Sequence, residues 1–305
     1  MRRAKPRPGW EDVLAYLERG TALVLGTAGA GKTPLAGFLT AQLGRGLRRV
    51  GQVDADPGQT SIGPAGCLGL ALTGPWRAPA AQWFVGETSA RNLPLATVVG
   101  TARLAERARG EGAEVVIVDA PAVGTGEGGW DLLHHLTLAA GVNQVVAVER
   151  NGELRPFLDV VRSRVQVFRV PAQPEAGPAD HRGSRRRRRR EAAASRFRAH
   201  MAGARPVRFA RRRILDTSWT PGAEPEPGVV AGLLDGEGFC LALGVVEEVA
   251  EDSVLVLTPW RTRRAVARLQ VGGLRAERWE GPAAGPAGPA GAGGEPAVDW
   301  LLSEP

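Results

Sequence analysis

The chain has 305 residues, a formal net charge of +7 and two cysteines, Cys67 and Cys240. Two cysteines exclude a disulfide framework and a cysteine-rich zinc site, and we expect both to be buried thiols. No apolar run reaches the roughly eighteen residues that a membrane helix needs, and the first residues carry no secretory signal. A cytoplasmic protein without membrane association is therefore expected.

A short helix is predicted in "WEDVLAYLERG", and the strand "ALVLG" then enters a loop rich in glycine and alanine. Gly26 is followed after four residues by Gly31, Lys32 and Thr33, a spacing typical of loops whose backbone N–H groups surround a phosphate. Lys32 would reach the β- and γ-phosphates, and the Thr33 hydroxyl would bind Mg²⁺. The residues predicted to bind the nucleotide are Gly26, Thr27, Ala28, Gly29, Ala30, Gly31, Lys32, Thr33 and Pro34.

Strand candidates alternate with helical patterns from residue 21 to about residue 170. This alternation favours an α/β fold, in which a mostly parallel sheet is flanked by helices and binds ligands at the carboxyl ends of its strands. The helix after the glycine loop would point its free N–H groups at a bound anion. The strand candidates are "ALVLG", "RRVGQVDAD", "EVVIVDAP", "NQVVAVER" and "RVQVFRV".

Three carboxylates follow predicted strands and are expected near the glycine loop. Asp54 and Asp56 lie on the same side of "QVDADPGQT", because strand side chains repeat every two residues. One would hold a metal ion while the other takes a proton from an attacking hydroxyl. Asp119 ends the apolar run from Val115 to Val118 and is a second metal-ligand candidate. The alternative for any one of the three is a turn-capping role.

The type of nucleotide follows from a missing motif. An Asn-Lys-x-Asp stretch, which would indicate guanine recognition, is absent from the sequence. ATP with Mg²⁺ is therefore the expected cofactor pair.

Residues 181–213 hold fourteen arginines and a single acidic residue, Glu191. Such a run is commonly a solvated or disordered segment, or a localisation signal. Ala193, Phe197 and Met201, however, are spaced by four and form an apolar stripe that would dock a helix. Arginines at a helix N-terminus repel one another and oppose the macrodipole, so an anionic partner is expected. We predict a helical lid whose arginines contact a transferred phosphoryl group and a nucleic-acid backbone.

Short β-rich runs with turn signals follow, in "VVAGLLDGEGFCLALGVVEEVAEDSVLVLTP". "GPAAGPAGPAGAGGEPAV" is typical of a flexible segment. The predicted organisation is a helical lead-in over 1–20, a P-loop domain over 21–215 with the lid at 182–203, a β-rich domain over 216–280 and a Gly/Pro/Ala-rich tail over 281–305.

The motifs together resemble a known family. "VDADPGQTSIGPAG" after a GxxxxGKT loop, followed by "FVGETS" and an arginine-rich lid ending in "FRAHMAGARP", is similar to the RNA polynucleotide 5′-hydroxyl kinases of the cleavage-factor (Clp/Grc) type. The resemblance implies transfer of the γ-phosphate of ATP, with Mg²⁺, to the 5′-hydroxyl of RNA or DNA. It implies catalytic roles for Asp56 as general base and for Lys32, Arg189, Arg190 and Arg196, metal ligands among Thr33, Asp54 and Asp119, and substrate contacts by Gln59, Thr88 and Ser89.

Two departures from the family pattern keep alternatives open. Residues 120–123 read Ala-Pro-Ala-Val where relatives carry a Thr-x-Gly-Trp or Thr-Pro-Gly segment that contacts substrate or nucleotide, and Ala90 stands where proline is usual. For Thr88 and Ser89 two interpretations stay open with equal weight, a contact with the substrate and a role in forming a turn. An ATP-binding scaffold of an RNA-processing complex is therefore a second hypothesis, and a small-molecule kinase or P-loop GTPase is a third.

Overall fold

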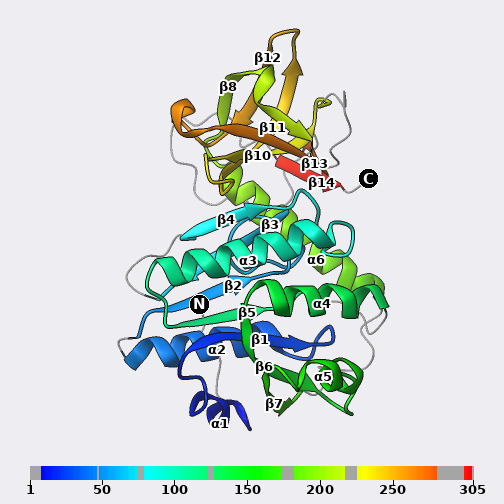
Figure 1. The fold of residues 1–305 in the computed structure, drawn as a ribbon. Helices are drawn as coiled ribbons and strands as arrows, with labels where there is room; N and C mark the ends of the chain where they lie inside the picture. The colour runs from blue at the N-terminus through cyan, green and yellow to red at the C-terminus, as the bar shows by residue number, and fades with distance from the viewer. Residues whose placement is uncertain are drawn as a thin grey trace, which may run out of the picture. The chain divides into compact units, whose positions relative to one another are not determined.

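A computed structural model describes residues 8–46, 48–73, 79–122, 127–172, 182–216, 225–279 and 299–303. The chain divides into two compact units, Met1–Arg182 and Gly183–Pro305 (Figure 1).

The first unit is built on a seven-stranded sheet with the order β4-β3-β2-β5-β1-β6-β7. All five predicted strands are present, as β1, β2, β5, β6 and β7, and all pair in parallel. Its elements are α1 (Trp10–Leu14), β1 (Gly20–Gly26), α2 (Lys32–Leu43), η1 (Gly44–Gly46), β2 (Val50–Asp54), β3 (Cys67–Leu72), β4 (Ala81–Phe84), α3 (Pro94–Gly110), β5 (Val115–Asp119), α4 (Glu127–Ala139), β6 (Val142–Glu149), α5 (Arg155–Val161) and β7 (Gln166–Pro171).

Two strands on one side of the sheet, β3 and the edge strand β4, were not predicted. β3 pairs antiparallel with β2, and β4 pairs antiparallel with β3. The segment from Ala55 to Gly66 separates β2 from β3 and contains no helix. Parallel pairing would require a crossover connection, usually a helix, so β3 returns antiparallel to β2.

Helices cover both faces of this sheet, as the alternation predicts. Val50 on β2 belongs to the same buried cluster as Phe38 of α2 and Trp10 of α1, whose ring centroids lie 5.3 Å apart. The next residue, Gly51, faces Ala108 of α3, since a Cβ at Gly51 would stand 2.8 Å from the Ala108 Cβ. Successive strand residues point to opposite faces, so α2 and α3 cover opposite faces of the sheet.

The second unit begins with the long arginine-rich helix and continues as a mostly antiparallel sheet. The predicted apolar stripe of the helix is confirmed, because Ala193, Phe197 and Met201 are buried. The Nε2 atom of His200 accepts the Leu243 N–H at 2.9 Å, and burial lowers the pKa of His200 to about 4. The elements are α6 (Arg182–Met201), β8 (Arg205–Ala210), η2 (Arg211–Arg213), β9 (Ile214–Asp216), β10 (Val229–Leu234), β11 (Cys240–Val249), β12 (Ser253–Thr258), η3 (Arg263–Ala265), β13 (Arg268–Trp279) and β14 (Asp299–Ser303).

The sheet of the second unit curls back toward itself. Its strands follow the order β14-β13-β10-β11-β12-β8, and β9 pairs in parallel with β13. β8 and β9 thus lie at opposite ends of this strand order, although only the three residues of η2 separate them in sequence. Three residues span at most about 11 Å, so the two edges lie near each other around a buried core that includes Phe209, Val256 and Leu269.

The predicted domain limits remain a prediction. The first compact unit ends at Arg182, and β8, which lies before residue 215, forms hydrogen bonds with β12 of the C-terminal sheet. Within the predicted tail, Asp299–Ser303 form β14, which pairs with β13, and residues 280–298 lie outside the described part. Cys67 and Cys240 are buried, as expected.

Candidate active site

The carboxyl ends of the central strands bring the predicted acidic residues to one edge of the sheet. Asp119 at the end of β5 pairs in register with Val24 of β1 on one side and with Asp54 of β2 on the other. The Ala55 N–H donates to the Asp119 carbonyl at 3.0 Å and continues this row beyond β2. The register therefore brings Asp54 and Asp119 side by side, next to the strand that leads into the glycine loop.

The glycine loop takes a shape that requires glycine at two positions. Gly29 and Gly31 have φ values of 80° and 104°, in the left-handed region that other residues avoid. The ammonium of Lys32 donates to the carbonyl oxygens of Gly26 at 2.9 Å and Thr27 at 3.3 Å, which folds the side chain back over the loop. No side chain caps α2 at Gly31, so the first N–H groups of this helix remain suited to an anion.

A hollow of about 300 Å³ opens beside this loop. It combines six of the nine residues predicted to bind the nucleotide with the predicted base and one predicted substrate residue. Its lining consists of Ala28, Gly29, Gly31, Lys32, Thr33, Pro34, Asp56, Gln59, Ala120 and Ala122. Gly26, Thr27 and Ala30 are not part of this lining.

Asp56 is held in place by backbone donors. Its Oδ1 accepts the N–H groups of Gly58 and Gln59, each at 3.0 Å, and its Oδ2 accepts the Ala122 N–H at 3.3 Å. The carboxylate is thereby fixed at the wall of the hollow, where Oδ2 also accepts a long hydrogen bond of 3.5 Å from the Gln59 side-chain amide.

Asp54 is buried beneath the turn that carries Asp56. One oxygen accepts the Asp56 N–H at 3.1 Å, and the other accepts the backbone N–H of Ser61 and, at 2.7 Å, its hydroxyl. Burial raises the pKa of Asp54 to about 6, against the opposing effect of these hydrogen bonds. Asp54 therefore orders the loop between β2 and β3.

Asp119 differs from Asp54 because one of its buried oxygens, Oδ1, has no hydrogen-bond partner among the described residues. Burial and the neighbouring Asp54 carboxylate raise the pKa of Asp119 to about 8, while a hydrogen bond with Thr33 and the charge of Lys32 oppose the rise. A buried orphan carboxylate oxygen beside a hydroxyl is the donor set that a hard cation prefers.

The loop with Thr88 and Ser89 lies against the Asp56 turn. A Cβ at Gly58 would stand 2.1 Å from the Thr88 carbonyl oxygen, so only glycine allows this approach. Both hydroxyl residues are partly exposed. Their predicted substrate contacts remain predictions, and their loop lies beside the turn that carries Asp56, the predicted base.

The predicted lid arginines lie on α6, in the second unit. Arg190 and Arg196 are exposed on this helix. Arg189 is helical, and its side chain lies outside the described part. Their contribution to the site remains a prediction.

Several features of the site were not predicted. Residues 120–123 were predicted to be a changed substrate clasp, and in the structure the Ala122 N–H donates to Asp56; Val123 lies outside the described residues. No role was predicted for Ser61. Glu153 was also missed; its carboxylate accepts the Asn151 N–H at 2.9 Å and lies 3.5 Å from the Thr27 hydroxyl. A backbone N–H donor such as that of Ala122 can belong to any residue type, so the sequence gives no sign of it. Ser61, seven residues after Asp54, instead carries a hydroxyl that is visible in the sequence.

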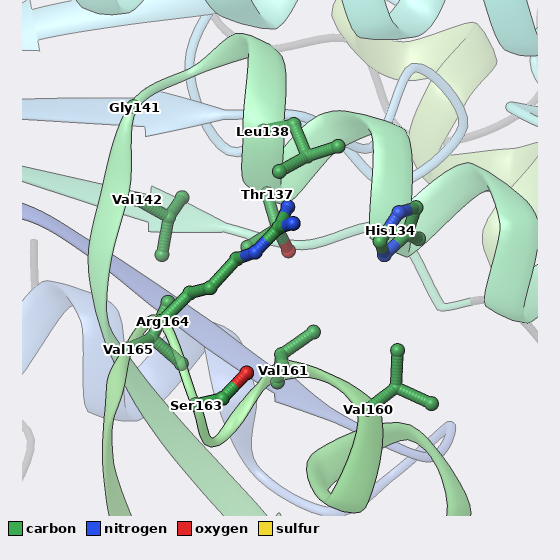
Figure 2. Close-up of a pocket in the computed structure, with 10 residues that line it drawn as sticks. All are labelled: His134, Thr137, Leu138, Gly141, Val142, Val160, Val161, Ser163, Arg164 and Val165. Atoms are coloured by element: carbon green, nitrogen blue, oxygen red, sulfur yellow. The ribbon is translucent and has the colours of Figure 1, made fainter.

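A second hollow, of about 310 Å³, lies at the opposite edge of the sheet, beside Val142 at the start of β6 (Figure 2). Val160, Val161 and Val165 line it from α5 and the turn after it. Figure 2 shows the Arg164 side chain reaching across it toward Thr137. It contains none of the predicted site residues.

The fold and the loop define a P-loop nucleotide-binding protein. The sequence model of the family described as "mRNA cleavage and polyadenylation factor CLP1 P-loop" matches residues 26–198. The chain belongs to this family.

Similar proteins extend over most of the chain. A polyribonucleotide 5′-hydroxyl-kinase of Thermococcus kodakarensis is 24% identical over 327 residues, covering 87% of this chain and 90% of its own length. A polyribonucleotide 5′-hydroxyl-kinase of Pyrococcus horikoshii is 24% identical over 321 residues, covering 87% of this chain and 88% of its own length. The solved structure of wild-type Clp1p in complex with Pcf11p has a TM-score of 0.65 at 14% identity, covering 89% of this chain and 80% of Clp1p, and shows the same fold.

None of the helices in the described part of the chain combines the length and the apolar character that crossing a membrane requires.

Proposed function

We propose that this protein is an ATP-dependent polynucleotide 5′-hydroxyl kinase that acts on RNA ends. The observation that carries the proposal is that Lys32, Thr33 and Asp56 line one hollow at the edge of the sheet. A phosphate-binding loop and a carboxylate across the same small space suit in-line transfer of a phosphoryl group to a hydroxyl. The archaeal relatives, named polyribonucleotide 5′-hydroxyl-kinases, support RNA as the acceptor.

The proposed step is a single displacement. The 5′-hydroxyl oxygen of the acceptor forms a bond to the γ-phosphorus of ATP, the bond from this phosphorus to the β,γ-bridging oxygen breaks, and ADP leaves. Asp56 receives the hydroxyl proton. Lys32 and the N–H groups at the start of α2 hold the β- and γ-phosphates, because donors aimed at the developing charge favour the transition state.

The site also fits Mg²⁺. Thr33 and Asp119 would hold it, with Asp54 behind them, and the orphan Oδ1 of Asp119 is the observation that supports this fit. Mg²⁺ commonly takes one or two protein ligands and fills its other positions with phosphate and water. When bound, it would neutralise charge on the phosphates.

The acceptor is proposed to enter on the side of the Thr88 loop. Gln59 lines the hollow beside Asp56, and Thr88 and Ser89 lie next to the same turn. The lid arginines Arg189, Arg190 and Arg196 are proposed to add positive charge at the phosphoryl group and the RNA backbone. A cytoplasmic location remains a prediction.

The scaffold hypothesis rested on the changed segment at residues 120–123. In the structure this segment still supplies a donor to the proposed base through the Ala122 N–H. No observation favours loss of catalysis, so the kinase is the function we adopt.

The test uses γ-labelled ATP and oligoribonucleotides that differ only in a 5′-hydroxyl or a 5′-phosphate. We expect label on the 5′-hydroxyl oligonucleotide alone and only with Mg²⁺ present. Equal labelling of both, or ATP hydrolysis without any labelled oligonucleotide, would contradict the proposal. A matched 5′-hydroxyl DNA shows whether the acceptor sugar matters.

A further inference from the structure

The turn between β12 and β13 is fastened to the core at both ends. Trp260 packs against the core of the second unit, and its indole N–H donates to the Thr262 carbonyl at 3.0 Å. Val266 is buried at the other end. Between these anchors the Ala265 N–H donates to Thr262 and the Val266 N–H to Arg263, which closes the short helix η3. The turn therefore holds its shape without a ligand.

Three arginines project from this fastened turn. Arg261, Arg263 and Arg264 are all exposed. None of the three forms an ion pair with another residue in the described part of the chain. Three like charges within four residues repel one another, and this repulsion is relieved when an anion binds between them.

A second arginine run, distant in sequence, meets this turn. Arg213 of η2 donates from Nη1 to the Val266 carbonyl at 2.6 Å. Ile214, directly after η2, pairs with Leu269 at the start of β13. Arg212 is exposed beside Arg213, so the runs 211–213 and 261–264 form one basic surface at one end of the sheet. We call these two runs the double-arginine surface.

The acidic side chains of the neighbouring turns form no ion pair with Arg261, Arg263 or Arg264 among the described residues. The turn between β11 and β12 carries Glu251 and Asp252, and the Asp252 carbonyl accepts the Arg211 N–H at 2.9 Å. The turn between β10 and β11 carries Asp235, whose Oδ1 accepts the N–H groups of Glu237 and Phe239, each at 2.9 Å. Within the described part of the chain, the charges of these three arginines are thus available to an external anion.

We propose that the double-arginine surface binds the sugar–phosphate backbone of a single-stranded polynucleotide, away from the 5′ end that receives the phosphoryl group. This inference rests on the proposed function, because it takes the bound polynucleotide to be the substrate of the kinase. Each guanidinium can donate two parallel hydrogen bonds to one phosphate, and a polynucleotide supplies phosphates in a row. Because the turn is already fixed by Trp260 and Val266, little ordering opposes binding.

Direct binding tests this proposal without relying on catalysis. The full chain and the triple variant Arg261→Gln/Arg263→Gln/Arg264→Gln are titrated, without ATP, against a 3′-fluorescein single-stranded oligoribonucleotide at several salt concentrations. Each phosphate contact to a single strand contributes a slope of about 0.7 to the salt dependence of affinity, so losing three should lower the slope by about 2. The affinity difference between the two proteins should shrink more than about tenfold between ~50 and ~200 mM salt.

A matched variant controls for net charge. Arg155→Gln/Arg162→Gln/Arg164→Gln removes three exposed arginines from α5 and the turn after it, in the first unit, and should leave the slope unchanged. Equal slopes for the wild type and the turn variant would overturn the proposal. Displacement of the oligonucleotide by polyglutamate at equal charge would also overturn the proposal, because the surface would then be assigned to an acidic protein partner.

Kinetics separate failure of this proposal from failure of the proposed function. With γ-labelled ATP, the turn variant should keep the wild-type kcat/KM for a dinucleotide acceptor and show a raised KM for a long one. An unchanged KM for the long acceptor would overturn the surface while leaving the kinase intact. Absence of phosphorylation by the wild type would remove the kinase, and the binding slopes would still decide the surface.

Discussion

Two hollows of nearly equal volume lie at opposite edges of the same sheet, about 300 Å³ at the glycine loop and about 310 Å³ between α4 and α5. The first is lined by Lys32, Thr33, Asp56 and Gln59 and by the start of a helix. Half of the residues that line the second are Val or Leu, and Arg164 lies across it (Figure 2). Volume does not distinguish the two, and the convergence of charged groups does.

The cause lies in the direction of the strands. In parallel β1, β2 and β5 every carboxyl end reaches the same edge, and the loops that follow can place donors and acceptors side by side. At the opposite edge the strands begin, and the neighbouring helix ends present carbonyl groups that do not favour an anion. This contrast leads to four predictions, which change residues in or near one hollow or the other.

The largest difference in kcat/KM is expected between variants of the positively charged residues of the two hollows, Lys32 and Arg164. Lys32→Ala should lower kcat/KM for ATP by about 10²–10³-fold, because it removes a donor aimed at the transferred phosphate. Arg164→Ala, which removes the cation of the second hollow, should leave kcat/KM unchanged. Steady-state kinetics with varied ATP measure both. Similar losses in the two variants would mean that the second hollow also takes part in the reaction.

The next effect is expected at a carboxylate. Asp56→Asn should lower kcat by about 10²-fold or more, because it removes the proposed general base, with little change in nucleotide affinity. Asp131→Asn is the control with an equal change of charge, because the Asp131 side chain is exposed on α4, one turn before His134 of the second hollow. Single-turnover phosphorylation and a fluorescent-nucleotide titration separate chemistry from binding. A wild-type rate in Asp56→Asn would exclude this residue as the base.

A smaller effect is expected from one added methyl group. Gly58→Ala would place Cβ 2.1 Å from the Thr88 carbonyl oxygen, and relieving this clash should cost about 1–3 kcal/mol of unfolding free energy. It should also raise KM for the oligonucleotide more than KM for ATP, since the displaced loop lies on the proposed acceptor side.

Gly141→Ala is the matched change in the second hollow. There φ is +66° and nothing stands within 4 Å, so only backbone strain of about 1–2 kcal/mol is expected, without a kinetic effect. Denaturant unfolding and the two KM values measure the pair. A raised KM for ATP alone in Gly58→Ala would contradict the proposed position of the acceptor.

The first hollow was largely predictable from the sequence because its parts are local. The spacing from Gly26 to Thr33 and the pair Asp54 and Asp56 each depend on neighbours a few residues away. Of the five parallel strands, β1 and β5 carry the apolar runs expected of strands buried on both faces, whereas the edge strand β7 is buried only at Val170. Register alone then brought Asp119 beside Asp54.

The unpredicted features depend on contacts between distant segments. The antiparallel pairing of β3 and β4, the return of β9 to β13 and the contact of Arg213 with Val266 join residues whose local pattern carries no sign of the partner. The Ala122 N–H on Asp56 was missed for a different reason, because a main-chain donor is independent of the side chain. Backbone contacts and long-range pairing are thus what the structure adds.

The smallest effect is expected from the exposed apolar side chains beside the second hollow. Leu138 and Val160 are 47% and 61% exposed, so Leu138→Ser and Val160→Ser should each change the unfolding free energy by less than about 0.5 kcal/mol. Neither should alter kcat or KM for ATP or RNA, because the hollow lies at the edge where the strands begin. Thermal unfolding and steady-state kinetics measure this. A kinetic change without a change in stability would show that the two edges of the sheet are coupled, and the assignment of function to the first hollow alone would then be wrong.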